Sequence, residues 1–512
     1  MLVKSFGSAV FGIEATTITI EVNIDKGISF ILVGLPDSAV KESQQRIKAA
    51  LTNNGFTYPM KEVTINMAPA DIRKEGSTFD LPIAIGILAA SEQINEDALG
   101  DYILLGELSL DGSLNPLKGV LPIALKAKEE GFKGIILPEK NVREAAIVDG
   151  LEVYGAENIN QVVEFLNEGT GLTASSIDIN QEFYNRLNDL SVDFRDVKGQ
   201  QNIKRAFEIA ASGSHNIILI GPPGAGKSML AKRLPTILPP LNINESLETT
   251  KIHSVAGKVS AGGSLITERP FRKPHHTISD VALVGGGGYP QPGEISLAHN
   301  GVLFLDELPE YKRSVLEVMR QPIEDRTVTI SRAKFTVEYP ASFMLVAAMN
   351  PCPCGFYNHP EKECVCAPGI VQNYLNKISG PLLDRIDLHV EVTPVSFNEL
   401  AYHQPEEGSK DIRERVVQAR LKQEERFKDA EDIHSNSQMT SKQLRKYCQI
   451  DEACHAILKQ AMDKLGLSAR AYDRILKVAR TIADLDGKEE ISTIHISEAI
   501  QFRSLDRDDW AK

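Results

Sequence analysis

One short segment constrains the fold of this 512-residue chain more than any other. Residues 215–232 read HNIILIGPPGAGKSMLAK, which is an apolar strand, a glycine-rich turn and the start of a helix. Gly221, Gly226, Lys227 and Ser228 satisfy the pattern G-x-x-x-x-G-K-[ST] in that strand–loop–helix context. Such glycines let backbone N–H groups turn toward a phosphate, and the helix N-terminus adds its positive dipole end. The segment therefore predicts a phosphate-binding loop within an α/β sheet.

The side chains of this loop have distinct expected roles. Lys227 would reach the β- and γ-phosphates of a nucleoside triphosphate, and the Ser228 hydroxyl would bind Mg²⁺. The predicted cofactors are therefore ATP and Mg²⁺. The predicted nucleotide-binding residues are Gly221, Pro222, Pro223, Gly224, Ala225, Gly226, Lys227 and Ser228, together with Asp306 from a later strand.

Hydrolysis of a bound nucleotide requires acidic groups at the end of a second buried strand. The segment GVLFLDE, residues 301–307, supplies them. We expect Asp306 to hold Mg²⁺ and Glu307 to polarise the attacking water. Many strands end in acidic turns, so this run carries little information by itself. Its place about eighty residues after the phosphate-binding loop makes it a candidate catalytic site.

Composition limits the class of protein. The chain is 42% hydrophobic and 24% charged, as in folded globular proteins, and its length predicts about three domains at roughly 150 residues each. Its longest apolar stretch, residues 81–90, is shorter than the ~20 residues of a membrane-spanning helix. The first residues carry one lysine and no sustained apolar run before Glu14, unlike a signal peptide. We expect no membrane partner and a cytoplasmic location.

Charge argues against a protein that is basic over its whole surface. The chain has 56 Lys and Arg residues and 69 Asp and Glu residues, which gives a net charge of −13. Two segments depart from this average. Residues 251–276 contain five basic residues and one acidic residue, and residues 326–334 (RTVTISRAK) alternate like a β-hairpin arm with three basic residues. Either segment is a candidate anion-binding surface or an ordinary solvated face.

Four of the six cysteines gather in one short segment. Cys352-Pro-Cys354 and Cys364-Val-Cys366 bracket nine residues, and four thiolates complete the tetrahedral shell of a structural Zn²⁺ site. The C-x-C spacing is tighter than the usual C-x₂₋₄-C, and His359 is an alternative ligand. Free thiols and a redox disulfide are the other interpretations of this cluster.

Several long segments resemble one known family. They are residues 268–310 (ERPFRKPHHTISDVALVGGGGYPQPGEISLAHNGVLFLDELPE), 347–355 (AAMNPCPCG) and 379–392 (SGPLLDRIDLHVEV). The chain resembles the ComM/YifB group of magnesium-chelatase-like AAA+ ATPases over nearly its whole length. The resemblance implies an α/β fold with three domains. These are a Lon-protease-like α+β domain at 1–166, a P-loop AAA+ parallel-sheet core at 192–394 and an all-α C-terminal lid at 395–512, and a linker at 167–191 joins the first two.

The local patterns agree with this organisation, because strand-like runs and helices alternate before residue 395 and helices dominate after it. The predicted strands of the first domain are 17–22, 28–33, 62–67 and 134–137, its helices include 38–53 and 122–130, and the predicted C-terminal helices are 411–428, 451–465, 469–485 and 494–503.

The resemblance also implies roles for three further polar side chains. Asn350, after the predicted strand 343–349, matches the sensor-1 position, which contacts the γ-phosphate or the attacking water. Arg385 matches the arginine finger that is offered to the ATP of a neighbouring subunit. Arg470 resembles sensor 2, and Arg474 is the competing choice. A finger acting between subunits implies a homo-oligomer, and the family implies a hexameric ring.

By the same resemblance, the two basic segments face the central pore of the ring. Arg272, Lys273, Arg332 and Lys334 would grip the backbone of branched or single-stranded DNA, independently of sequence. The implied function is an ATP-driven DNA translocase, a helicase that promotes branch migration in homologous recombination and natural transformation. The alternatives are a magnesium-chelatase-like motor for metal insertion and an ATP-dependent protein remodeller. The protease-like region before the AAA+ core argues against the chelatase.

Two N-terminal segments, 70–80 and 106–112, look like the Lon protease domain, which works through a Ser-Lys dyad. The nucleophile position falls at or beside Ser77 and Thr78, but the lysine position is apolar, close to Leu121. We therefore expect a protease-like fold that serves assembly or partner contacts and has no proteolytic activity.

Overall fold

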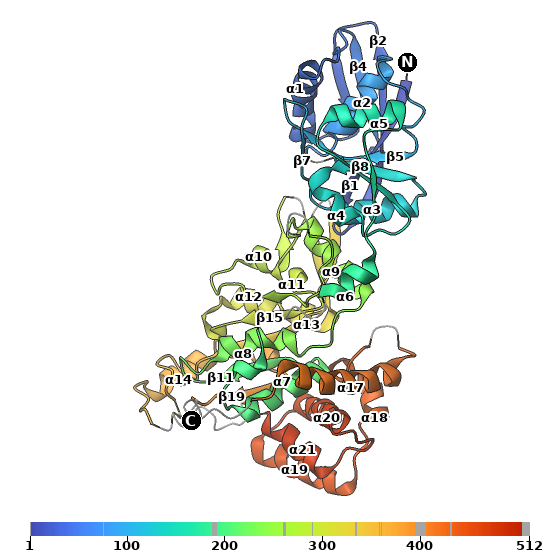
Figure 1. Ribbon diagram of the computed structural model, residues 1–512. Helices are drawn as coiled ribbons and strands as arrows, with labels where there is room; N and C mark the ends of the chain where they lie inside the picture. Colours follow the sequence, from blue (N-terminus) through green and yellow to red (C-terminus); the bar gives the residue numbers. More distant parts are fainter. Residues whose placement is uncertain are drawn as a thin grey trace. The chain divides into compact units, whose positions relative to one another are not determined.

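The chain divides into two compact units, whose elements are labelled in Figure 1. The first unit comprises residues 1–187, 242–267 and 289–292, and the second comprises 188–241, 268–288 and 293–512. The computed structural model describes residues 2–74, 76–186, 192–259, 263–288, 290–332, 335–357, 359, 361–394, 406–430 and 433–503.

The first unit is built on an eight-stranded mixed sheet with the strand order β10-β9-β8-β5-β1-β2-β4-β3. Along β2, Ile18, Ile20 and Val22 are fully buried and alternate with partly exposed residues, the period-2 pattern of a strand with one face on the core. The strands are β1 Leu2–Phe11, β2 Glu14–Asp25, β3 Phe30–Val33, β4 Glu62–Ala68, β5 Tyr102–Leu104, β8 Gly134–Pro138, β9 Glu152–Ala156 and β10 Ala174–Ser175, with a separate pair β6 Glu107–Leu108 and β7 Leu114–Asn115.

The apolar stretch 81–90 is a core helix of this unit. It lies in α2 (Asp80–Ala90), every residue of which is buried. A helix buried on all sides has no polar face, so its sequence shows no helical periodicity. Its first residue, Asp80, is paired with Arg46 of α1 at 2.7 Å. The helices of the unit are α1 Ser38–Asn53, α2, α3 Val120–Glu129, α4 Val142–Ala145, α5 Ile159–Glu168, α6 Ile179–Arg186 and α9 Ile243–Val255.

The second unit contains a five-stranded sheet in the order β12-β15-β18-β11-β19, in which every described pairing is parallel. All residues of β11, β15 and β18 are buried, as expected for parallel strands that are covered on both faces. The prediction of a parallel-sheet core is confirmed. The strands are β11 Ile217–Ile220, β12 Phe271–Arg272, β15 Val302–Leu305, β18 Met344–Met349 and β19 Leu388–Glu391.

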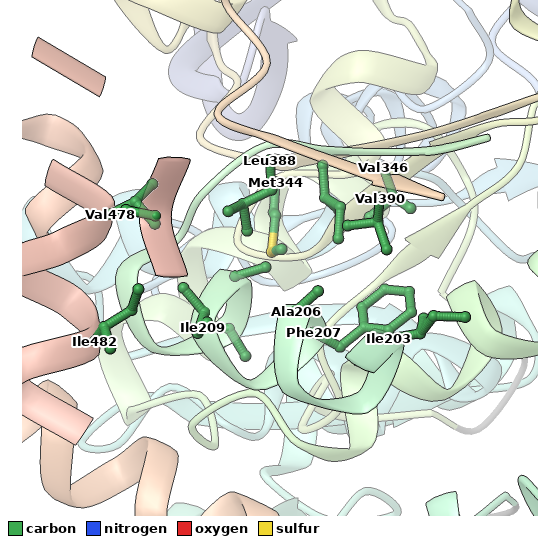
Figure 2. Close-up of a cluster of buried hydrophobic side chains, with 14 of the residues drawn as sticks. Ile203, Ala206, Phe207, Ile209, Met344, Val346, Leu388, Val390, Val478 and Ile482 are labelled. Atoms are coloured by element: carbon green, nitrogen blue, oxygen red, sulfur yellow. The ribbon is translucent and has the colours of Figure 1, made fainter. Parts of the chain in front are cut away.

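Helix α7 (Gln201–Gly213) joins this sheet to the C-terminal helices. Its apolar residues pack in one buried cluster with residues of β18, β19 and α20 (Ala469–Leu485). A fully buried Val, Leu, Ile or Phe side chain stabilises the fold by about 1.5–3 kcal/mol, so this shared cluster binds the helices firmly to the sheet. Figure 2 labels Ile203, Ala206, Phe207 and Ile209 of α7, Met344 and Val346 of β18, Leu388 and Val390 of β19, and Val478 and Ile482 of α20.

The described elements that begin after residue 405 are helices. Their starts are marked by side chains that cap the first turn: Asp451 accepts the Cys454 N–H, and Ser468 accepts the Ala471 N–H. The predicted helices at 451–465 and 469–485 agree with the structure to within one residue. The helices are α17 Ser409–Phe427, α18 Ser441–Tyr447, α19 Glu452–Leu465, α20 and α21 Thr493–Gln501.

The second unit also contains a separate two-stranded sheet. Thr327–Arg332 (β16) pairs antiparallel with Phe335–Pro340 (β17), with Thr329 opposite Glu338. Among the described residues, no helix has both the length and the apolar character needed to cross a bilayer. The remaining helices of the second unit are α8 Lys227–Arg233, α10 Asp280–Val284, α11 Glu294–Leu297, α12 Arg313–Val318, α13 Arg320–Asp325, α14 Pro368–Leu375 and α15 Gly380–Leu383.

Candidate nucleotide-binding site

The phosphate-binding loop connects β11 to α8, as its sequence predicts. Gly224 and Gly226 have φ angles of +81° and +84°, in the left-handed region that glycine adopts without strain. Gly221 is required for a different reason. A Cβ atom at this position would lie 2.3 Å from the backbone oxygen of Val392 on the neighbouring chain segment. The three glycines therefore allow a tight loop that lies against the edge of the sheet.

The ammonium group of Lys227 lies inside this loop. Its Nζ donates to the carbonyl oxygens of Gly221 at 2.6 Å and Pro222 at 2.9 Å, and to Asn350 Oδ1 at 3.2 Å. Burial lowers the pKa of Lys227, and the negative charges of Asp306 and Glu307 oppose this effect. The side chain is therefore held at the position from which it would meet a phosphate.

Ser228 and Asp306 meet at the end of β15. The Ser228 hydroxyl donates to Asp306 Oδ2 at 2.6 Å, and Lys273 Nζ donates to the same oxygen at 2.7 Å. Burial would raise the pKa of Asp306, but the hydrogen bonds from Lys273 and Ser228 outweigh it, and the pKa lies below the ordinary value. The carboxylate is thus ionised beside a hydroxyl. This donor set fits Mg²⁺, which prefers oxygen ligands.

Glu307 follows Asp306 in a strained turn. Its φ angle is +54°, a left-handed conformation that costs a non-glycine residue of order 1 kcal/mol or more. The side chain is 57% exposed, and its Oε2 lies 3.2 Å from His276 Nδ1. The carboxylate is therefore open to solvent next to the Asp306 site, where an attacking water would have to be activated.

Asn350 completes the group from a third strand, because it directly follows β18. The strand order places β15, β18 and β11 side by side, and their carboxyl ends meet at one edge of the parallel sheet. That edge brings together Lys227, Ser228, Asp306 and Asn350. Lys273 and His276 also belong to this site, and no sequence motif predicted them there, although both lie in the segment FRKPHH.

Comparisons with known proteins agree with this geometry. Three family profiles match: "Magnesium chelatase, subunit ChlI" over residues 193–400, "Subunit ChlI of Mg-chelatase" over 20–141, and "Magnesium chelatase, subunit ChlI C-terminal" over 406–503. Competence protein ComM of Haemophilus influenzae is 44% identical over 504 residues, which cover 98% of this chain and 97% of that protein. The YifB protein of Escherichia coli is 43% identical over 98% of this chain and 96% of its own length.

The chain belongs to the ComM/YifB family of magnesium-chelatase-like AAA+ proteins. Similarity over almost the full length of both proteins assigns the whole chain to this family, including the parts outside the nucleotide site. Lon protease 2 of Bacillus subtilis is 29% identical over 149 residues, or 28% of this chain and 26% of that protein. Membership of an AAA+ family suggests ATPase activity with ATP and Mg²⁺.

The arginine that resembles a finger is paired within its own chain. Arg385 Nη2 lies 2.6 Å from Glu324 Oε1, and its Nη1 donates to the Pro381 carbonyl at 2.6 Å. The side chain is only 12% exposed. In this ComM/YifB-family protein the guanidinium is therefore held near the surface by two fixed contacts that also define its orientation.

The two sensor-2 candidates lie in different environments. Arg470 is 70% exposed and pairs with Asp384 at 2.9 Å. Arg474 pairs with Asp387, which is almost fully buried and also lies 3.1 Å from His215 Nδ1. Burial opposes ionisation of Asp387, but the charge of Arg474 and the hydrogen bond with His215 hold its pKa well below the ordinary range. Arg474 thus belongs to a buried charge network, and Arg470 does not.

The predicted DNA-binding residues fall into two groups. Arg272 forms two hydrogen bonds with Glu294, both 2.7 Å long, and Lys273 pairs with Asp306. Both side chains therefore form ion pairs with residues of the second unit. Arg332 ends β16, and Lys334 lies outside the described residues, as does the side chain of Arg332.

The position expected for a proteolytic lysine is filled by a buried leucine. Leu121 of α3 is fully buried, and its N–H donates to Glu144 Oε1 at 3.1 Å. The Ser77 hydroxyl donates to a Glu107 carboxylate oxygen, and the Thr78 carbonyl accepts from the backbone N–H of Gly106. A carboxylate at the Ser77 hydroxyl is not the amine of a Ser-Lys dyad.

Proposed function

We propose that this protein is an ATP-hydrolysing ring motor that translocates on DNA, a helicase that promotes branch migration in homologous recombination and natural transformation. One observation carries the proposal: Lys227, Ser228, Asp306 and Asn350 converge at one sheet edge in a chain that is 44% identical to competence protein ComM. The motor would act in the cytoplasm as a homo-oligomer, in a hexameric ring.

Each part of the site has a role in this proposal. The loop 221–228 would bind the phosphates, and Mg²⁺, held by Ser228 and Asp306, would neutralise charge on the phosphoryl group. Glu307 would accept a proton from the attacking water, and Asn350, which already contacts Lys227, would orient that water or the γ-phosphate.

Hydrolysis would require two subunits. Arg385 of one subunit would meet the γ-phosphate bound by its neighbour, after exchanging Glu324 for the phosphate. Arg470 would be the sensor-2 residue for the bound nucleotide. It lies in the helical lid, residues 395–512, which follows the core at 192–394. The region 1–166, joined by the linker 167–191, would serve assembly or partner contacts.

The DNA contacts would come from the hairpin β16–β17, through Arg332 and Lys334. Arg272 and Lys273 would need to leave Glu294 and Asp306 before they bind phosphates. An ATP-dependent exchange of these partners would link the nucleotide state to the grip on DNA. Phosphate contacts predict sequence-independent binding that weakens steeply as salt rises.

The deciding measurement is the ATPase rate with and without forked DNA and four-way junctions, alongside a strand-exchange assay. DNA stimulation and branch migration by the wild type, both lost in Lys227→Ala, would support the proposal. A wild-type ATPase indifferent to every DNA structure would refute it.

A second candidate is a chelatase-type motor, which the three family descriptions favour. The N-terminal region does not exclude it, because one of those descriptions covers residues 20–141. A protein remodeller is the third candidate, since a protease-like region suits a protein partner. ATPase stimulated only by chelatase subunits, or only by a client protein, would select one of these two.

A further inference from the structure

The four clustered cysteines form a compact group of thiols in the second unit. The Sγ atom of Cys352 lies 3.3 Å from that of Cys354 and 3.7 Å from that of Cys364, and Cys354 Sγ lies 3.5 Å from Cys364 Sγ. All four sulfur atoms, including that of Cys366, lie within 4.8 Å of one another. These separations are far longer than a disulfide bond of about 2.05 Å, and all four are free thiols.

The spacing matches the shell of a four-coordinate metal. Zn–S bonds of about 2.3 Å in a tetrahedron place the sulfurs about 3.8 Å apart, close to the separations in the cluster.

The geometry favours the four cysteines over His359 as the metal ligands. Both the Glu361 and the Lys362 N–H groups donate to His359 Nδ1, at 3.0 and 3.1 Å, and the imidazole packs edge-on against Phe356. His359 therefore organises the turn between the two cysteine pairs. The complete set of sulfur ligands leaves no open coordination position, which is typical of a structural site.

The cluster also lies next to the phosphate-binding loop. Gly355, in the turn that begins at Cys352, has a φ angle of +83°, and a Cβ atom added to it would lie 2.5 Å from Pro223 Cδ. Asn350, which accepts a hydrogen bond from Lys227, precedes Cys352 by two residues. The cysteine loop thus contacts the nucleotide site at two points.

We propose that Cys352, Cys354, Cys364 and Cys366 bind one Zn²⁺ as a closed structural site, and that this metal clamps the loop 350–366 against the phosphate-binding loop. The described part of this loop contains neither helix nor strand, so the thiol cluster is its main internal cross-link. Metal at the cluster fixes Asn350 and Gly355, and nucleotide affinity follows metal occupancy. This second part rests on the proposed nucleotide-binding function.

The first test is the metal content of the full-length protein, purified under reducing conditions without chelators. We expect about one zinc per chain by elemental analysis, and the visible spectrum of tetrahedral thiolate coordination after replacement with Co²⁺. The variant with all four cysteines changed to serine is expected to lose the metal. His359→Gln and Cys448→Ala, a buried cysteine outside the cluster, are expected to keep it. Wild-type protein with less than a tenth of a zinc per chain would refute the site, as would zinc that survives in the four-serine variant.

The second test uses wild-type protein only, so that it does not depend on the folding of a variant. Zinc is removed with a zinc-selective chelator in excess Mg²⁺, and the affinity for a fluorescent ATP analogue is measured before removal, after removal and after zinc is restored. We expect removal to weaken binding at least tenfold and restoration to reverse it. Unchanged affinity after complete removal would refute the clamp. A zinc-loaded protein that never binds the analogue would refute the nucleotide site but leave the metal site standing.

Discussion

The Ser228 hydroxyl donates a 2.6 Å hydrogen bond to a carboxylate oxygen of Asp306, 78 residues further along the chain. Lys273 donates to the same oxygen at 2.7 Å. The predicted magnesium site is therefore supported by a cation that the sequence pattern assigned to DNA. Lys273 therefore has two possible roles, support of Asp306 and DNA binding. A residue that supports Asp306 affects ATP turnover whether or not DNA is present.

Lys273→Ala tests this separation. A hydrogen bond between charged groups contributes about 1.5–3 kcal/mol, which corresponds to a factor of roughly 10 to 100. Lys273 is partly exposed, so we expect the lower end, about a tenfold loss of ATP turnover without DNA. Arg272→Ala, which removes the neighbouring cation paired with Glu294, is the matched control and is expected to keep DNA-free turnover. Normal DNA-free turnover in Lys273→Ala, with weakened DNA binding, would return Lys273 to the DNA-binding group.

Glu307→Gln tests whether Glu307 is the general base that accepts a proton from the attacking water. Its carboxylate is exposed and pairs with His276, so the amide should leave nucleotide binding largely intact. Loss of a general base costs about 10²- to 10⁴-fold in rate. The measurements are single-turnover hydrolysis and analogue affinity. Glu310→Gln, a carboxylate of the same turn that pairs with Lys377, is the control. Equal rates in the wild type and Glu307→Gln would exclude Glu307 as the base.

Arg385→Ala tests hydrolysis between subunits. An arginine finger contributes about 10³- to 10⁵-fold to turnover, so the variant is expected to bind ATP and hydrolyse almost none. If the finger acts on a neighbour, mixing Arg385→Ala with Lys227→Ala should restore activity, because one protein supplies the ATP site and the other supplies the finger. Mixtures that remain inactive, although the two proteins assemble together, would contradict action between subunits. Glu324→Gln, which removes the intrachain partner, should retain turnover.

The conformation of the loop 221–228 was predictable from the sequence because the information that determines it is local. The glycines, Lys227 and Ser228 lie within eight positions, and each answers a backbone or charge requirement of the loop itself. The pairing of Lys273 with Asp306 and the pairing of Glu324 with Arg385 could not be predicted from the sequence. The partners lie 33 and 61 residues apart in the sequence, so only the folded structure brings each pair together.

Secondary structure was predictable where burial and periodicity agree. Helix α20 has a strongly amphipathic sequence and was placed correctly at 469–485. The strand predicted at 28–33 begins only at Phe30, because Ile28 is 94% exposed in a bend. Isoleucine has a high strand propensity, but Ile28 stands alone next to a glycine and lies outside β3. Strand propensity is overridden by the tertiary context in such cases.

Arg474→Ala and Arg470→Ala form a matched pair for the sensor-2 assignment. Removing Arg474 takes away the ion-pair partner of the buried Asp387 carboxylate, and breaking a buried pair in this way costs about 3–5 kcal/mol. Arg470 is exposed, so its pair with Asp384 contributes about 1 kcal/mol or less. Thermal unfolding should therefore separate the two variants clearly. If Arg470 is sensor 2, its variant keeps the stability of the wild type and loses ATP turnover. A stable Arg474→Ala variant would contradict the buried network.

His389 predicts how stability depends on pH. It lies buried on β19, where burial and the positive charge of Arg503 hold the pKa of the imidazole well below its ordinary value near 6.5. The unfolded chain therefore binds a proton that the folded chain does not. The stabilising contribution is complete above pH 6.5 and falls as the pH drops below that value, by about 1.4 kcal/mol per pH unit. Denaturant unfolding between pH 7.5 and 5 measures this slope. It should become shallower in His389→Gln and stay unchanged in the exposed control His455→Gln. Equal slopes in the wild type and His389→Gln would show that His389 titrates normally in the folded protein.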